Sequence, residues 1–459
     1  MNVFRVFFIA TVCCGLVLTQ IACGQEEDSE VSLSRQPAHS HLSGRLVVST
    51  EIDTTQDYSG FGVLVAVERE GEPDTLGYGV TDRNGDFALD ITAPARGIYA
   101  IVISRSGQIL KIGEIAVAEG DSARLEATFP VGQQLLRLRS LENGAWAAYQ
   151  NTKAQHNNRL LELLQAGSYT EETARDQILQ SSMILWGMQG TFANTMGSEA
   201  AATEAVIMAA GWHDSLAVAW ALDIPPTYIN YAEVGRIARQ AQARLAGQEA
   251  ALAMVREFQE RAIDDDQRAQ LQSELVLARL DSLEQEEALQ EASSMAETYA
   301  GTPWGQWAER AIYEIEHLLP GMDAPAFAVR TATGDSLTLE TLRGRHVILE
   351  FYRPQDATYQ RELEGRNLLL EEIGQKALII LSLSLEPDSL LNDAFLDGRD
   401  IPGHHVFLTQ GDLPRRYNVN VLPTRYLLDP EGKIVAKYIG GAMAALREAV
   451  LARLPQDVE

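Results

Sequence analysis

Residues 346–364, HVILEFYRPQDATYQRELE, decide the fold of the C-terminal part of the chain. The run His346–Phe351 is largely apolar and includes β-branched residues, which predicts a buried strand. A turn follows, and we expect a helix from about Glu362, whose carboxylate would compensate the positive end of the helix dipole. A strand, a tight turn and a helix N-terminus bring backbone N–H groups to one point. The sequence therefore predicts a turn of the kind that stabilises an anion.

This turn contains no cysteine. A helix N-terminus lowers the pKa of a cysteine thiol, yet the turn holds Asp356, Ala357, Thr358 and Tyr359. All three cysteines of the chain lie within its first 23 residues; they are Cys13, Cys14 and Cys23. The chain after Cys23 therefore has neither a disulfide nor a thiol nucleophile of its own.

Four further segments surround the turn in a fixed order. They are Gly321–Phe327 (GMDAPAF), Ser336–Arg345 (SLTLETLRGR), Val421–Thr424 (VLPT) and Arg425–Val435 (RYLLDPEGKIV). Together they resemble the thioredoxin superfamily, in particular envelope thiol–disulfide proteins of the TlpA/ResA kind and their peroxiredoxin relatives. The resemblance implies a thioredoxin-like α/β fold for residues 320–459, with Pro423 in the cis form.

The same resemblance identifies a degenerate active site. Alignment on Phe351 and Tyr352 places Asp356 and Tyr359 where the family has the two cysteines of its C-x-x-C motif. An alignment shifted toward the peroxiredoxin pattern also fits Pro354 and Thr358, and it places Arg361 at the peroxidatic cysteine. Thiol–disulfide exchange requires a thiolate, so neither alignment yields a catalytic residue. We expect Asp356 to act as a helix cap or turn residue.

The proline motif predicts a candidate peptide-binding site. The resemblance implies that the loop of Leu422, Pro423 and Thr424 lies beside the turn, where its main chain could bond an extended peptide without any thiol. Tyr359 would then supply an aromatic contact. The alternative is that Pro423 only preserves the fold and that Tyr359 is a core residue.

The N-terminal residues predict export. Residues 1–22 are apolar after Arg5 and read as a signal peptide. Gln20–Cys23 resembles a bacterial lipoprotein box, so we expect lipidation at Cys23, with cleavage of a soluble secreted protein as the alternative. Residues 23–42 read as a flexible acidic tether. The expected location is the bacterial cell envelope, either periplasmic or on the outer-membrane surface, with membrane contact through the lipid.

Residues 43–130 and 131–319 predict two further domains. The first has short strands separated by turn residues and resembles carboxypeptidase-regulatory-like β-sandwich modules. Thr81–Phe87 predicts a hairpin, with Asn84 and Gly85 suited to positive φ; a calcium loop that uses Asp82, Asn84 and Asp86 is a weaker alternative there, because the required glutamate is missing. The second domain is all-α by its 3.6-residue periodicity. Its tryptophans are core anchors or, alternatively, part of a peptide groove.

The chain is therefore predicted to be multidomain, with an N-terminal all-β sandwich, an all-α helical middle and a C-terminal α/β thioredoxin-like fold. Its formal charge of −27 argues against nucleic acid as a partner. No metal-site or cofactor motif is visible. The leading functional hypothesis is a binding or scaffolding role toward a protein or peptide partner. The rival is a thiol–disulfide oxidoreductase that borrows a cysteine from its partner.

Overall fold

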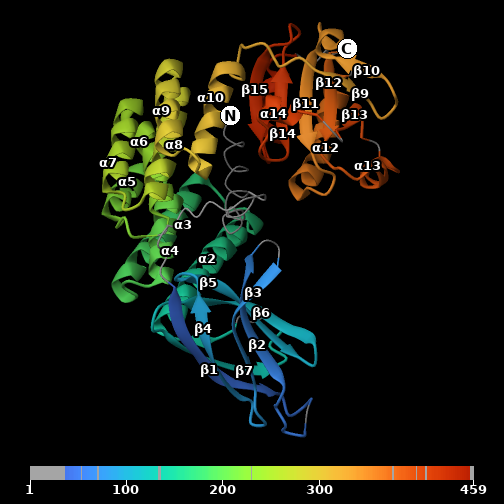
Figure 1. Cartoon of the computed structure of the whole chain (residues 1–459). Coiled ribbons are helices and arrows are strands. Elements are labelled where there is room, and N and C mark those ends of the chain that lie inside the picture. Colours follow the sequence, from blue (N-terminus) through green and yellow to red (C-terminus); the bar gives the residue numbers. More distant parts are fainter. Residues whose placement is uncertain are drawn as a thin grey trace. The chain divides into compact units, whose positions relative to one another are not determined.

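The computed structural model describes residues 37–454, except 53, 70–71, 133–135, 229, 375–376, 400 and 409–410 and the side chains of 69, 72 and 73. Figure 1 shows an N-terminal β-rich region, a helical middle and a C-terminal α/β domain. The chain divides into two compact units between Ala278 and Arg279. The predicted signal peptide, Cys23 and most of the predicted tether lie outside the described residues. Within the described part, no helix has the length and apolar character needed to cross a membrane.

The β-rich region consists of two four-stranded sheets, with strand orders β4-β1-β7-β8 and β3-β2-β5-β6. The strands are β1 (Ala38–Val48), β2 (Phe61–Arg69), β3 (Glu72–Val80), β4 (Asp86–Ala93), β5 (Gly97–Arg105), β6 (Gln108–Val117), β7 (Ser122–Phe129) and β8 (Leu138–Arg139). Leu42 and Leu125 of one sheet and Val63 and Ile101 of the other belong to one buried core. The resemblance to carboxypeptidase-regulatory-like modules stays a prediction.

The sequence predicted a hairpin at Thr81–Phe87. This prediction is wrong, because β3 and β4, which the turn connects, belong to different sheets. Of the two residues expected at positive φ, Gly85 has it and Asn84 does not. The Asp82 carboxylate accepts the Asn84 N–H at 2.8 Å, and Gly85 has a φ of 85°. A Cβ at Gly85 would lie 2.1 Å from the Leu46 carbonyl oxygen, so glycine is required there. Among the described residues, no group of three or more His, Cys, Asp or Glu side chains is placed to hold a metal ion.

The helical middle contains α2 (Leu141–Gln165), α3 (Glu171–Thr191), α4 (Met196–Ala209), α5 (Asp214–Asp223), α6 (Tyr231–Ala246), α7 (Gln248–Arg261), α8 (Asp265–Asp281), α9 (Gln285–Thr298) and α10 (Pro303–His317). Buried alanines recur in the core of α4–α7, and such small side chains let helix backbones approach closely. Trp186 and Trp220 stack in this core with ring centroids 5.0 Å apart. The core-anchor prediction is confirmed for these two tryptophans.

The C-terminal domain is built on a five-stranded sheet of order β13-β12-β11-β14-β15, in which β14 runs antiparallel to β11. Its elements are β9 (Ala328–Arg330), β10 (Ser336–Thr338), α11 (Leu339–Leu342), β11 (His346–Tyr352), α12 (Ala357–Ile373), β12 (Leu378–Ser384), α13 (Ser389–Leu396), β13 (His404–Phe407), α14 (Leu413–Arg416), β14 (Thr424–Leu428), β15 (Ile434–Ile439) and α15 (Met443–Leu451).

Side chains of β11 alternate between two cores, as a strand buried on both faces requires. Ile348 packs with α12 and α15 on one face. Leu349 and Phe351 pack on the opposite face, with residues that include Leu318 and Tyr417. The predicted strand is therefore confirmed as the central strand of the sheet.

Helix α10 packs against the C-terminal domain, although its sequence belongs to the predicted helical middle. The Tyr313 hydroxyl donates to the Arg416 carbonyl at 3.1 Å, and Lys437 Nζ donates to Glu314 at 2.8 Å. Tyr313 also packs against the core that contains Leu318. The C-terminal compact unit thus includes a helix that precedes the α/β domain in the sequence.

Candidate functional site at the strand–turn–helix

The turn after β11 leads directly into α12, which begins at Ala357 rather than near Glu362 as the sequence predicted. The helix begins there because a side chain caps its N-terminus. Asp356 is the N-cap residue, and its carboxylate accepts the Tyr359 N–H at 2.8 Å. A cap of this kind satisfies one of the free N–H groups in the first helical turn. The capping role predicted for Asp356 is confirmed.

Tyr359 occupies the interior of the domain, where its side chain is fully buried. Its ring stacks on Tyr352 with centroids 4.2 Å apart and lies near Phe395. Its hydroxyl donates to Glu350 Oε1 at 3.0 Å. Burial, together with the Glu350 charge, raises the pKa of Tyr359 well above its usual range, so the phenol stays a neutral donor. The structure therefore corrects one expectation: Tyr359 offers no aromatic surface to a peptide.

Glu350 is the centre of a buried polar cluster that sequence reasoning missed. It lies on β11 and is fully buried. Arg366 Nε of α12 and the Ser382 hydroxyl of β12 donate to its Oε1 at 2.9 and 3.0 Å. Arg425 Nε of β14 donates to its Oε2 at 2.7 Å. Both arginine side chains are 1% exposed, so these ion pairs are excluded from solvent.

The two guanidinium groups keep Glu350 ionised. Burial alone raises the pKa of a carboxyl group. At Glu350 the charges and hydrogen bonds of Arg366 and Arg425 outweigh burial and lower the pKa to about 2. A visible signal was a charged residue inside the apolar run VILEFY, because a buried charge needs a partner. Its partners lie 16 and 75 residues away and could not be located by pattern.

Glu362 extends this cluster toward the surface. Arg425 Nη1 donates to Glu362 Oε2 at 2.7 Å, and the Met443 N–H donates to Glu362 Oε1 at 2.9 Å. Because α12 begins earlier than predicted, Glu362 lies in its second turn and does not compensate the dipole of the first. It joins α12 to β14 and α15. Two carboxylates and two guanidinium groups then form a cluster with no net charge.

The positions that fit the peroxiredoxin pattern make only local contacts. Arg361 is exposed, and its guanidinium donates to the Thr358 hydroxyl at 3.1 Å and to the Ala357 carbonyl at 3.2 Å. Both partners lie in the first turn of the same helix. Arg361 thus has no nucleophile or acid–base partner among the residues that the structure describes.

The proline loop adjoins the turn, as the resemblance implied. The Leu422–Pro423 peptide is cis, and Thr424 pairs in register with Phe351 at the end of β11. Pro423 and Thr424 are buried and Leu422 is half-buried, whereas the Val421 side chain is 52% exposed. Within the described residues, neither the N–H nor the carbonyl of Leu422 has a hydrogen-bond partner.

The following comparisons with known proteins concern the C-terminal domain. Residues 320–437 match the AhpC/TSA family. Thiol-disulfide oxidoreductase ResA of Bacillus cereus (strain ZK / E33L) is 29% identical over 126 residues, which cover 27% of this chain and 72% of that protein. Thioredoxin-like protein YneN of Bacillus subtilis (strain 168) is 26% identical over 122 residues, covering 26% and 71%. A solved thiol-disulfide oxidoreductase from Bacteroides fragilis NCTC 9343 aligns with 26% identity and a TM-score of 0.26, covering 28% and 98%.

The C-terminal domain is thioredoxin-like, of the TlpA/ResA type. The resemblance read from the four sequence segments is thereby confirmed. The thioredoxin-like domain has no cysteine in its own sequence. At the two positions that we align with the family's cysteines, it has a helix cap and a buried phenol instead.

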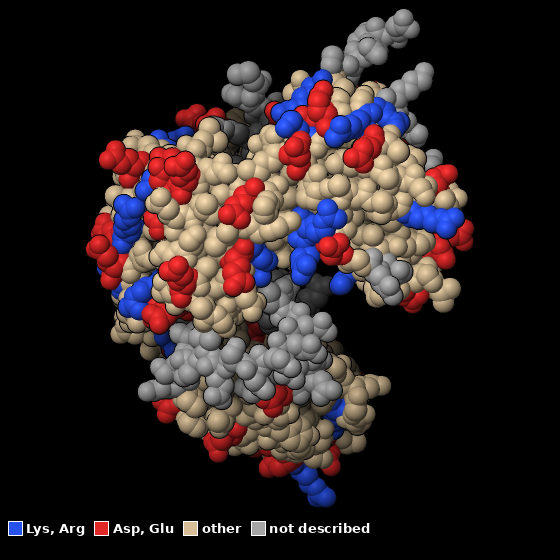
Figure 2. All heavy atoms as spheres, turned by 45° about the horizontal axis from the view of Figure 1, so that its top comes forward, with Lys and Arg blue, Asp and Glu red and all other residues tan. Residues whose placement is uncertain are grey.

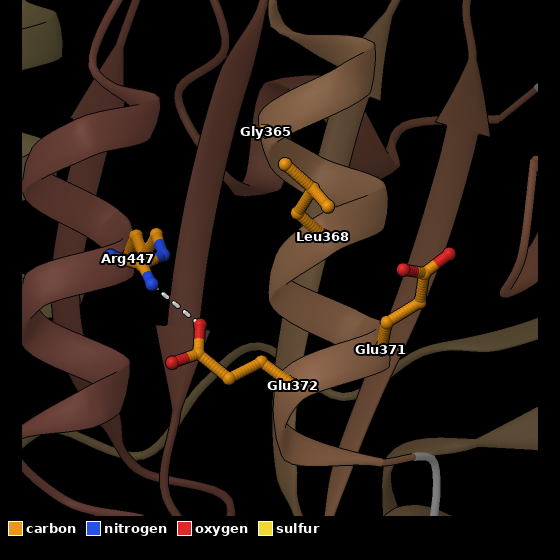
Figure 3. A pocket seen from close by; sticks show the side chains of 5 residues that line it. All are labelled: Gly365, Leu368, Glu371, Glu372 and Arg447. Atoms are coloured by element: carbon orange, nitrogen blue, oxygen red, sulfur yellow. Dashed lines mark hydrogen bonds and ion pairs between the residues drawn. The ribbon is translucent and has the colours of Figure 1, made fainter.

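One cavity on the thioredoxin-like domain has no unpaired basic side chain among its lining residues. It has a volume of about 510 Å³ and is lined by Gly365, Leu368, Glu371, Glu372 and Arg447. Figure 3 shows that Arg447 of α15 reaches toward Glu372 of α12, and their side chains are paired at 2.6 Å. The basic group of this cavity is therefore already neutralised by a neighbour.

Proposed function

We propose that this chain is a lipid-anchored envelope protein whose thioredoxin-like domain is redox-inactive and binds an extended segment of a protein partner at the proline loop. The observation that carries the proposal is a contrast within one site. Asp356 and Tyr359 are committed to structural hydrogen bonds. The main chain of Leu422, two residues before β14 begins at Thr424, has N–H and carbonyl groups without a hydrogen-bond partner among the described residues.

The free main-chain groups favour recognition of an extended peptide. A segment that lies along a loop or sheet edge gains affinity from main-chain hydrogen bonds and specificity from side-chain contacts. The Leu422 main chain supplies the hydrogen-bonding groups, and the exposed Val421 side chain supplies an apolar surface beside them. Neither contribution needs a thiol.

The rival function is thiol–disulfide oxidoreduction, which the names of the relatives suggest. That reaction breaks a disulfide through a mixed disulfide with an attacking thiolate. This chain has no cysteine after Cys23, so a partner would have to provide the thiol. The buried cluster around Glu350 favours the binding role, because it fills the interior below the turn with a phenol and ion pairs.

The envelope location rests on the N-terminal sequence. The apolar segment and the box ending at Cys23 are the features that bacterial export and lipidation use. Acyl chains contribute roughly 0.8 kcal/mol per buried CH₂ to membrane binding. Radiolabelled palmitate fed to the cells should therefore be incorporated into the unaltered chain and not into a Cys23→Ser variant. Equal labelling of the two chains, or no labelling of either, would contradict lipidation at this residue.

Site-specific photo-crosslinking in intact cells tests the binding role, with the probe at Val421. The matched control is a probe at Leu390 on α13, which is 74% exposed in the same domain. We expect a discrete adduct from position 421 and none from position 390. Adducts at both positions, or at neither, would reject the proline loop as the binding site.

An insulin-reduction assay separates the two functions. The full chain, purified in detergent, should reduce insulin disulfides no faster than buffer. Reduction above the buffer rate by the variant Cys13→Ser/Cys14→Ser/Cys23→Ser, which has no cysteine, would overturn the redox-inactive assignment. The same preparation still carries residues 320–459 unchanged.

A further inference from the structure

A second cavity of the C-terminal unit lies between α10 and the segment 415–420. Its volume is about 390 Å³. It is lined by Glu309, Arg310, Tyr313, Arg415, Arg416, Asn418, Val419 and Asn420. We call it the arginine pocket. Its two walls come from the last helix of the predicted helical middle and from the thioredoxin-like domain.

The three arginines of this pocket are uncompensated. Among the described residues, Arg310, Arg415 and Arg416 have no ion-pair or hydrogen-bond partner for their guanidinium groups. The pocket contains one carboxylate, that of Glu309, so its charge is positive. The nearby Glu314 is already engaged by Lys437 at 2.8 Å and does not neutralise the pocket. Unpaired arginine forks favour a planar anion that can accept two hydrogen bonds.

Side-chain hydrogen bonds hold the walls in place. The Tyr313 hydroxyl donates to the Arg416 carbonyl at 3.1 Å. Asn418 Nδ2 donates to the Arg310 carbonyl at 3.3 Å and to Glu314 at 2.5 Å. These bonds cross from the α/β domain to α10. A site that is ordered before the ligand arrives loses less entropy on binding.

The pocket adjoins the proline loop along the chain. Asn420 lines the pocket, and the next residues along the chain are the exposed Val421 and the half-buried Leu422. A peptide bonded to the Leu422 main chain would therefore contact this chain two residues after Asn420, which lines the pocket. The pocket is thus placed to receive a side chain from that peptide.

We propose that the arginine pocket binds aspartate or glutamate side chains of the partner segment, so that the partner is acidic next to the part that contacts the proline loop. The proposal rests on the proposed function and specifies its partner. Charge-assisted bonds from arginine to carboxylate are roughly twice as strong as neutral hydrogen bonds, so this pocket supplies specificity that the proline loop alone lacks.

The chain's negative charge does not prevent this binding. Residues 320–459 contain 15 basic and 20 acidic side chains, a net charge of −5, whereas the whole chain carries −27. Figure 2 shows acidic and basic side chains interspersed over the visible face. Charges beyond a Debye length of roughly 8 Å are screened at physiological salt, so the arginines within the pocket dominate.

Selection from a random dodecapeptide library displayed on phage tests the proposal on the full chain in detergent. The variant Arg415→Glu/Arg416→Glu reverses two charges of the pocket. The control Arg343→Glu changes an exposed arginine of the same domain outside it. Peptides selected by the unaltered chain should be rich in Asp and Glu. The best one, fluorescently labelled, should bind the double variant at least tenfold more weakly and the control equally well.

Each outcome separates the two proposals. Selected peptides without an acidic bias, or equal binding by the double variant, would overturn the acidic specificity and leave the proline-loop function standing. No selected peptide at all, together with no adduct at position 421, would remove both proposals. Inorganic phosphate at the same concentration as the peptide should not displace the peptide. If it abolishes peptide binding, the pocket is a site for free anions, and the peptide assignment is overturned.

Discussion

The phenol oxygen of Tyr359 lies 3.0 Å from Oε1 of Glu350, inside the domain and directly behind the turn. This contact links the residue that we align with the family's second cysteine to a carboxylate that also binds Arg366 and Arg425. A thiol at position 359 would leave the space of the phenol ring empty and one donor to Glu350 missing. Tyr359 and the ion pairs of Glu350 therefore fill the interior behind the turn. A thiol at position 359 would require compensating substitutions in the same cluster.

Removing the Tyr359 hydroxyl should destabilise the domain without unfolding it. The variant Tyr359→Phe keeps the stacked ring but leaves Glu350 Oε1 without one donor. Loss of a hydrogen bond to a buried charge costs about 1–3 kcal/mol. Urea unfolding should show this loss in the free energy of unfolding. Tyr438→Phe, which alters a half-buried tyrosine of β15, serves as the control and should change the stability by less than about 0.5 kcal/mol.

Removing the charge of Glu350 should have a larger effect. In Glu350→Gln the guanidinium group of Arg366 remains buried without a counter-ion, and that of Arg425 keeps only Glu362. Breaking a buried ion pair from one side typically costs about 3–5 kcal/mol. The exposed Glu364 on α12 provides the matched control, Glu364→Gln. Equal stability of the two variants in urea would show that the cluster contributes little.

The stability of the C-terminal domain should depend on pH through the ionisation of Glu350 in the same cluster. The pKa of Glu350 is about 2 in the folded chain and ordinarily 4.5, because Arg366 and Arg425 outweigh the effect of burial. The folded state then binds fewer protons than the unfolded state between these values. Stability from this group is complete above about pH 4.5 and is lost as the pH falls toward 2, by roughly 3 kcal/mol in all. Thermal melts should show a steeper acid slope for the unaltered chain than for Glu350→Gln.

The cap of α12 can be tested independently of any function. Asp356→Ala removes the acceptor for the Tyr359 N–H and should cost about 0.5–2 kcal/mol. Asp356→Asn retains a capping oxygen and should be nearly neutral. Crosslinking from position 421 should persist in both variants. Loss of the adduct in Asp356→Asn, at unchanged stability, would instead indicate that the carboxylate charge takes part in binding.

Local patterns sufficed for the fold of the C-terminal domain but not for its interior. The apolar run of β11, the VLPT loop and the terminal hairpin RYLLDPEGKIV depend on near neighbours, and the structure has them as expected. The start of α12 was placed five residues too late, because Asp356 was weighed as a turn residue as well as a cap. An Asp followed by Ala357 and Thr358 is itself a helix-start signal, and it would have predicted the true boundary.

The candidate site was less predictable because its contacts are non-local. The sequence left Tyr359 either in a groove or in the core, and the structure has it in the core, where its side chain points toward Glu350. The Glu350–Arg425 pair spans 75 residues, and the arginine pocket joins residues of α10 to the segment 415–420. Periodicity within one element cannot locate such pairs. Only the presence of Glu350 in an apolar strand signalled that a buried partner existed.

A separate pH effect is expected in the helical middle. His156 of α2 is 6% exposed and lies 2.9 Å from the Ser181 hydroxyl of α3. Burial lowers the pKa of His156 from 6.5 to about 4. Above about pH 6.5 the histidine is neutral in both states, whereas between 6.5 and 4 the unfolded chain binds the extra proton. Stability of this region should therefore fall by roughly 3 kcal/mol as the pH drops through that window.

Hydrogen exchange measured by mass spectrometry can follow this effect locally, with peptides that cover α2 and α3. In the unaltered chain, protection of these helices should decrease from pH 6.5 to 4 after correction for the intrinsic exchange rate. His156→Gln cannot take up the proton and should flatten the dependence, whereas His213→Gln in the same unit should retain it. Because the Glu350 effect begins only near pH 4.5, peptides of β11 should keep their protection over most of this range. Simultaneous loss in both regions at pH 5–6 would show that a different group controls the acid response.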